Sequence, residues 1–174
     1  MALKDTLERI QEEQKVWADR NFGEQPSWMS LMGAIEEIGE LAHAHLKEAQ
    51  SIRNHEDHSE KAKDAIGDTV IFLCGYCSAR GWKLAVYEDN SYTIESAHTC
   101  IFSASASLGW AATLFADKDQ IVNTYINSAI NSVISALKDY CKLKGWDFEA
   151  VISETWDTVK QRDWKKNPDK AHEA

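Results

Sequence analysis

The sequence predicts an all-α protein, a bundle of about six helices in a single domain that spans residues 1–174. Only two prolines and eight glycines leave most of the chain free to be helical. Apolar residues recur every three or four positions along much of the chain, whereas the alternation typical of strands is rare. A hydrophobic fraction of 44% with seven tryptophans predicts a packed core.

The first segment is predicted to be an amphipathic helix, because alternating steps of four and three residues separate Leu3, Leu7, Ile10, Gln14 and Trp17. Gly23 and Pro26 interrupt this pattern, and Ser27 or Ser30 can cap the next helix. The second helix is therefore expected over about residues 31–49.

One broad face of the second helix is predicted to be buried, and it carries Leu31, Ile35, Ile38, Leu41, Ala42 and Leu46. Glu36, Glu37 and Glu40 fall on the opposite side. The polar residues 50–61 are expected to form a loop. A third helix follows over about residues 60–80, and it is apolar nearly all round after its first turn.

Helical patterns resume at about 94–116, 120–144 and 147–162, with a turn expected at 88–92. "YCSARGW" (76–82) recurs as "YCKLKGW" (140–146), and "IGELA" (38–42) resembles "LGWAA" (108–112). The repeat predicts two helical hairpins, over about 28–82 and 94–144, before a C-terminal helix and tail (147–174).

The second hairpin is expected to be a degenerate copy that serves packing. Its apolar pattern follows the first hairpin, but its carboxylates do not. The positions equivalent to the acidic residues of the first hairpin hold Ala106, Ser107, Trp110, Ser128 and Ser132. This asymmetry predicts that the chemistry belongs to the first hairpin. Trp110, Trp146, Trp156 and Trp164 are expected to be packing residues.

Composition narrows the class of protein. A net charge of −9 argues against a broad nucleic-acid-binding surface. The charged N-terminus does not resemble a signal peptide, and no apolar run approaches the ~20 residues of a membrane span. The four cysteines are predicted to be buried free thiols: Cys74, Cys77, Cys100 and Cys141. We therefore expect a reducing, cytoplasmic compartment.

Asp68 is a carboxylate in an otherwise apolar helix, and Asp64 lies one turn earlier on the same face. A buried carboxylate must be protonated, pair with a cation or bind a metal ion. Pairing with Lys61, Lys63 or Arg80 is the purely structural alternative.

Two antiparallel helices can place Glu37, Glu40, Asp64 and Asp68 around a common point. The glutamates alone would also suit a solvated helix face. Oxygen-only ligands from four acids favour hard cations, Mg²⁺ first and Mn²⁺ second. Because phosphate oxygens commonly complete a magnesium site, an acidic protein can still hold a nucleotide.

"EEIGELAHAHLK" (36–47) followed by "KDAIGDTVIFL" (63–73) resembles the MazG-like, all-α nucleoside triphosphate pyrophosphohydrolases. Their signature is E-E-x-x-E, followed on the next helix by E-x-x-D. Glu36, Glu37 and Glu40 match its first half, and Asp68 matches the final acid. The stretch 145–168 also resembles the C-terminal helix and tail of short members of the family.

The resemblance covers about residues 1–86 and 145–169, and it departs from the family at Ala65, where the signature has glutamate. Asp64, one residue away, is expected to serve instead. The family hydrolyses a nucleoside triphosphate to a monophosphate and pyrophosphate. By resemblance, Glu37, Glu40 and Asp68 hold Mg²⁺ with Asp64 as the fourth ligand, and Glu36 or Glu37 is the general base.

Basic residues are expected to meet the phosphates. The leading candidates are Arg162, Lys165, Lys166 and Asn167, and Lys47 and Lys63 are weaker ones. Trp28 is the candidate for stacking on the base, unless it belongs to the core. Short family members associate, so a homodimer or higher homo-oligomer is expected. Two alternatives stay open: a related pyrophosphatase for phosphoribosyl-ATP, dUTP or dCTP, and a non-catalytic helical module that binds metal or nucleotide.

Overall fold

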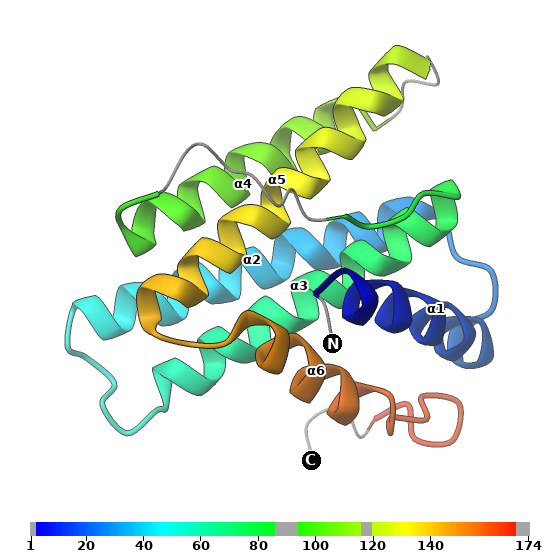
Figure 1. Cartoon of the computed structure of the whole chain (residues 1–174). Helices are drawn as coiled ribbons and strands as arrows, with labels where there is room; N and C mark the ends of the chain where they lie inside the picture. The colour runs from blue at the N-terminus through cyan, green and yellow to red at the C-terminus, as the bar shows by residue number, and fades with distance from the viewer. Residues whose placement is uncertain (1–2, 86–93, 116–119, 170–174) are drawn as a thin grey trace.

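The computed structural model describes residues 3–85, 94–115 and 120–169, and within them the chain is helical and has no strand. The helices are α1 (Leu3–Phe22), α2 (Ser27–Ala49), α3 (His58–Arg80), α4 (Ala97–Thr113), α5 (Gln120–Lys144) and α6 (Phe148–Val159) (Figure 1). The predicted all-α class is confirmed. None of these described helices combines the length and apolar character that crossing a membrane requires.

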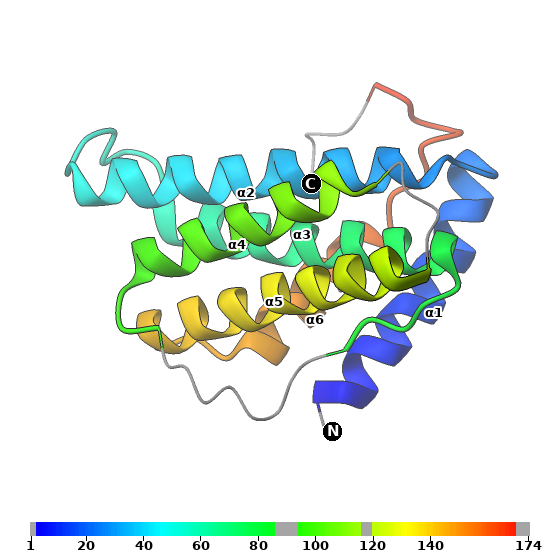
Figure 2. The ribbon, with the colours of Figure 1, turned by 90° about the horizontal axis from the view of Figure 1, so that it is seen from above.

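The central element of the fold is α3. It forms an antiparallel hairpin with α2 and also contacts α1, α5 and α6, while α4 pairs with α5 and lies beside α2 (Figure 2). This position explains the nearly all-apolar sequence of α3, because neighbours cover most of its circumference. As expected, the four cysteines are buried and free.

The two hairpins end in the same way. Gly81 and Gly145 adopt left-handed backbone conformations, with φ angles of 70° and 74°. The backbone N–H of the tryptophan that follows each glycine donates a hydrogen bond to the backbone carbonyl of a cysteine, at 2.8 Å. That cysteine lies four residues before the glycine. The tyrosine and tryptophan rings of each copy also pack together, with centroids 6.1 and 6.0 Å apart. The sequence repeat therefore corresponds to a repeated helix ending.

The first and last helices pack together near α3. Hydrogen bonds join α1 to α6 and the segment after it through Thr6–Glu149 (2.6 Å), Glu13–Trp156 (2.6 Å), Trp17–Arg162 (3.1 Å) and Asn21–Trp164 (2.8 Å). At Gly67 of α3, an added Cβ would lie only 2.1 Å from the Thr155 hydroxyl oxygen of α6. The absence of a side chain there permits the close approach of α6.

Several predicted helix boundaries are wrong. No side chain caps α2, which begins at Ser27 directly after Pro26, so neither predicted serine cap forms. Asp57 accepts a hydrogen bond from the backbone N–H of Glu60 at 3.0 Å and so starts α3 slightly earlier than expected. The last helix ends at Val159 rather than at about residue 162. The turn expected at 88–92 lies outside the described residues.

The face of α2 that meets the core also differs from the prediction. Ile35 and Leu46 are 40% and 49% exposed. The buried residues of α2 are Leu31, Gly33, Ala34, Ile38, Leu41 and Ala44. Small residues allow close packing at this seam: a Cβ at Gly33 would lie 2.4 Å from the Phe72 ring. Trp110, predicted to pack, is 57% exposed on α4.

Candidate active site

The α2–α3 hairpin brings acidic side chains from two helices to one seam. Glu37 and Asp68 are half-buried, and the charge of Asp68 acts on Glu37 across the two antiparallel helices. Glu36, Glu40 and Asp64 are exposed around them. The prediction that all three glutamates of α2 face away from the core therefore fails for Glu37, which the rotated face of α2 turns toward α3.

The pKa of Glu37 shows that the charges of these acids act on one another. The pKa of Glu37 is raised from 4.5 to about 8, chiefly by burial and then by the charges of Asp68, Glu40, Glu36 and Asp64, in that order of effect. Acids from both helices therefore lie close enough to oppose the ionisation of one side chain.

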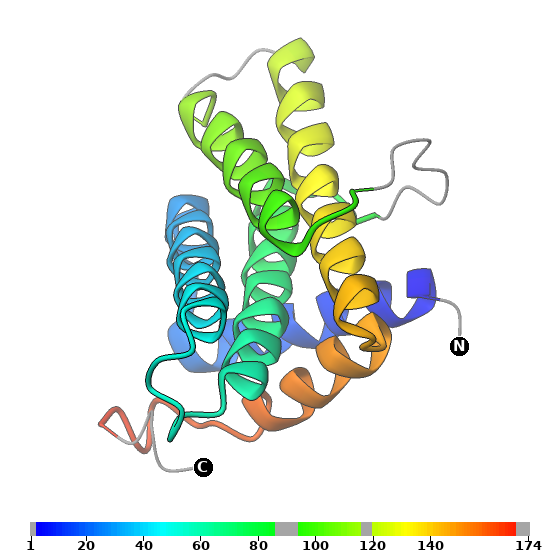
Figure 3. The same cartoon turned by 90° about the vertical axis from the view of Figure 1, so that its left-hand side faces the viewer.

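The neighbouring acids also act on Asp68, and here the charge of a cation acts as well. Burial, followed by the charges of Asp64 and Glu40, raises the pKa of Asp68 from 3.8 to about 6, while Arg162 opposes the rise. Arg162 follows α6, and Figure 3 shows this segment turning beneath α3 toward the side of α2. The C-terminal segment thus brings one guanidinium group to the acids.

These carboxylates have no ion-pair partner among the described residues. The three cations considered as partners of Asp68 are engaged elsewhere, in the contacts Lys61–Glu56 (2.6 Å), Lys63–Glu60 (2.6 Å) and Arg80 to the Tyr76 hydroxyl (3.2 Å). The alternative that Asp68 pairs with Lys61, Lys63 or Arg80 is therefore wrong. Arg162 acts on Asp68 through its charge and forms no ion pair with it.

The departure from the family signature has a clear place in the structure. Ala65 is only 1% exposed and packs in the core, so this position offers a methyl group and no oxygen ligand. Asp64 is exposed, and among the charged groups it acts most strongly on Asp68. That Asp64 takes the place of the missing glutamate stays a prediction.

The chemistry of the donors fits a hard divalent cation: the group offers carboxylate oxygens only, repels itself and has no cation pair. As they stand, no three or more His, Cys, Asp or Glu side chains in the described residues are arranged so that they could hold a metal ion. Glu40 and Asp64 are exposed, so their side chains can take other rotamers without disturbing the core.

Unlike Arg162, the other predicted phosphate-binding residues do not contribute to the pKa shift of Asp68. Lys47 lies on the same side of α2 as Glu40, seven residues and roughly 10 Å further along. Lys166 pairs with Asp163 at 3.3 Å, and its neighbours Lys165 and Asn167 are exposed.

Trp28 is not brought to the acidic group. It precedes Glu37 by nine residues, which at about 100° per residue places it on the opposite side of α2. Its side chain is 46% exposed, so the alternative that Trp28 belongs to the core is also wrong.

Comparison of the chain with protein-family models, with curated proteins and with solved structures gave no match. The function proposed below therefore depends on the site itself and on the motif residues that form it.

Proposed function

We propose that this chain is a Mg²⁺-dependent nucleoside triphosphate pyrophosphohydrolase, which converts a (d)NTP and water into a (d)NMP and pyrophosphate. The observation that supports it most is the meeting of carboxylates from two antiparallel helices at one seam, without an ion-pair partner. In its ionised form such a group is unfavourable unless a cation joins it. The MazG-like motif falls on these same residues.

In this proposal Glu37, Glu40, Asp64 and Asp68 hold the metal ion. When bound, Mg²⁺ (or Mn²⁺) neutralises phosphate charge and lowers the pKa of a coordinated water. Glu36 is exposed and lies at the edge of the group, so it is the better placed of the two candidate bases to accept a proton from the attacking water. Glu37 is half-buried between α2 and α3, and we assign it to ligation of the metal ion.

Arg162 is the proposed phosphate-binding cation, because among the candidates it is the one whose charge reaches Asp68. A guanidinium group can donate two parallel hydrogen bonds to a phosphate. Lys47, Lys165, Lys166 and Asn167 are proposed as secondary contacts for the outer phosphates.

The test is a panel of NTPs and dNTPs with Mg²⁺, scored for pyrophosphate against orthophosphate. Release of pyrophosphate and monophosphate supports the proposal, and turnover of dUTP, dCTP or phosphoribosyl-ATP alone would narrow the substrate. Orthophosphate release, or nucleotide binding without turnover, contradicts the proposal; the latter would favour the non-catalytic binding module.

The acids also predict how stability depends on pH. Because the folded-state pKa values of Asp68 and Glu37 are raised to about 6 and about 8, the folded state holds these protons more tightly than the unfolded state. The resulting stabilisation is complete below about pH 4 and is lost as the pH rises through 6 and then 8. Thermal melts of metal-free protein should show stability falling over this range.

Magnesium is expected to restore that stability mainly above about pH 7, where the acids would otherwise repel one another. In the metal-free protein, Glu37→Gln should raise the free energy of unfolding at pH 8 by about 2 kcal/mol, since solvent screening reduces the 1.36 kcal/mol per pKa unit. Equal effects of Mg²⁺ at pH 5 and pH 8 would contradict a shared metal site.

We further propose that a second copy of the chain covers the exposed sides of α2 and α4, giving a homodimer. Side chains that are 40% to 66% exposed there are Trp28, Met32, Ile35, Leu46, Phe102 and Trp110. Large uncovered apolar patches of this kind mark interaction sites. Analytical ultracentrifugation should show a dimer that becomes a monomer in a Met32→Glu/Phe102→Glu variant; a monomeric wild type contradicts the proposal.

A further inference from the structure

A polar notch lies where the second half of α1, residues 23–25, the start of α2 and the second half of α3 meet. Its cavity has a volume of about 230 Å³, and its lining includes Gln14, Lys15, Asp19, Ser30, Gly75 and Ser78. The notch shares no residue with the acidic group.

Gln14 is the unusual residue in this notch. Its side chain is only 7% exposed, and its Oε1 is buried without a hydrogen-bond partner. Nor does its Nε2 form a hydrogen bond with any described residue. A carbonyl oxygen buried in this way lowers stability, because its bonds to water are lost without replacement. A ligand that supplies a donor would remove this cost, and the Nε2 group could donate to the same ligand.

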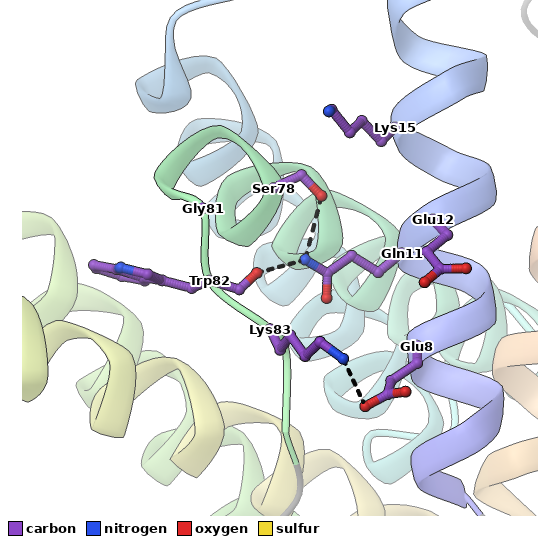
Figure 4. A pocket seen from close by; sticks show the side chains of 8 residues that line it. All are labelled: Glu8, Gln11, Glu12, Lys15, Ser78, Gly81, Trp82 and Lys83. Atoms are coloured by element: carbon purple, nitrogen blue, oxygen red, sulfur yellow. Dashed lines mark hydrogen bonds and ion pairs between the residues drawn. The ribbon is translucent and has the colours of Figure 1, made fainter.

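Gln11, one turn earlier on α1, provides the contrast. It is similarly buried, at 8% exposure, but all of its amide groups are used. Its Nε2 donates to the Ser78 hydroxyl (3.3 Å) and to the Trp82 carbonyl (2.7 Å), as Figure 4 shows. Its Oε1 accepts from the backbone N–H of Leu84 at 2.9 Å. Gln11 therefore has a structural role, which Gln14 lacks.

Gly75 leaves the space in which the polar groups of the notch lie. A Cβ at this position would be 2.9 Å from Gln14 Nε2 and 3.0 Å from the Ser30 hydroxyl oxygen. Alanine is the better residue for a helix interior. The lack of a side chain at Gly75 therefore lets the Gln14 amide and the Ser30 hydroxyl both lie close to α3.

The notch and the acids lie along the same seam of the hairpin. Gly75 follows Asp68 by seven residues, and Ser30 precedes Glu37 by seven, so both pairs keep the same side of their helices at a separation of roughly 10 Å. Phe72, which packs against α2 between them, is partly exposed. One molecule of nucleotide length can therefore reach both places.

We propose that this notch binds the base of the nucleotide whose phosphates meet the acids, with the Gln14 amide reading the base edge and Ser30 assisting. The inference rests on the proposed function. A glutamine amide offers a donor and an acceptor side by side, which matches the paired groups on a nucleobase edge, as in glutamine–adenine pairs. The cavity has room for one heterocyclic base.

The test separates this inference from the proposed function by using ligands without phosphate. Adenosine, guanosine, cytidine and uridine are titrated calorimetrically into the metal-free full-length chain. At least one should bind, and Gln14→Met should weaken that binding by about tenfold or more, the loss expected for a bidentate base contact. If no nucleoside binds, or if the variant binds like the wild type, the inference is wrong.

The melting temperature provides a second test, because a structural role for Gln14 predicts a change opposite to the one we expect. Gln14→Met fills a similar volume and removes an unpaired buried carbonyl oxygen, so its melting temperature should equal or exceed that of the wild type. Gln11→Met, the matched control, should lower it, because the partners of Gln11 lose their bonds. A melting temperature lowered equally by both substitutions would contradict the assignment.

The backbone side of the notch is tested by Gly75→Ala. The added methyl group should displace the amide and the hydroxyl and weaken nucleoside binding by about tenfold. Gly39→Ala is the matched control, because nothing lies within 4 Å of a Cβ at that glycine of α2. Unchanged binding in Gly75→Ala would overturn the placement of the base. Nucleoside binding without pyrophosphate release would preserve the notch and refute the proposed chemistry.

Discussion

Asp68→Asn is expected to abolish pyrophosphate release, lowering kcat/KM by more than the roughly 100-fold that the loss of a supporting group around a metal costs. The asparagine amide carries no charge and offers a single weak oxygen donor to a metal ion. The carboxylate that it replaces is half-buried on α3, beside the acids of α2. Glu40→Gln should have a similar effect. Steady-state kinetics with the best substrate of the nucleotide panel provide the measurement.

Glu60→Gln is the matched control, because Glu60 lies on the same helix but pairs with Lys63 at 2.6 Å. Its activity should stay near that of the wild type. Asp68→Asn should also keep or raise the melting temperature of the metal-free protein, since it removes repulsion from Asp64. Near-normal turnover in both Asp68→Asn and Glu40→Gln would mean that these acids do not hold the metal.

Gly67→Ala is expected to have the largest effect on stability, a loss of about 3 kcal/mol in the free energy of unfolding. The new Cβ would lie 2.1 Å from the Thr155 hydroxyl oxygen and 2.4 Å from its Cβ, so α6 must move away from α3. Arg162 follows α6 and should move with it, which would weaken substrate binding. Urea denaturation and KM measure the two effects.

Gly39→Ala again provides the control, since the same change at an open position of α2 should be neutral or stabilise the protein by up to about 1 kcal/mol. An unchanged urea midpoint in Gly67→Ala would show that α6 is not held against α3 as described.

The helices themselves were predictable because apolar spacing and two interrupting residues, Gly23 and Pro26, are local signals. The buried face of α2 was not. Ile35 and Leu46 follow the spacing of core residues but remain uncovered, and the true seam is lined with small residues around Gly33. Which of two apolar faces meets α3 is decided by packing between helices, and a single helical wheel does not contain that information.

The acidic group could be located because its motif spans two consecutive helices. That Glu37 points inward, and that Arg162 lies close to Asp68, depends on how α2, α3 and α6 pack together. Gln14 was assigned simply to an apolar stripe. Its signal was present in the sequence, as a polar residue at a core step between Ile10 and Trp17, but only the pocket beside it suggests a role.

Because α1 is joined to α6, the fold can be completed only late in protein synthesis. The acids of α2 and α3 leave the ribosome well before residues 148–164 exist, so the newly made hairpin lacks both its covering helix and its guanidinium group. Domains mature only when their last contacts become available. We expect nascent chains to stay inactive, and to expose the seam to chaperones, until the C-terminal helix docks beside the N-terminal one.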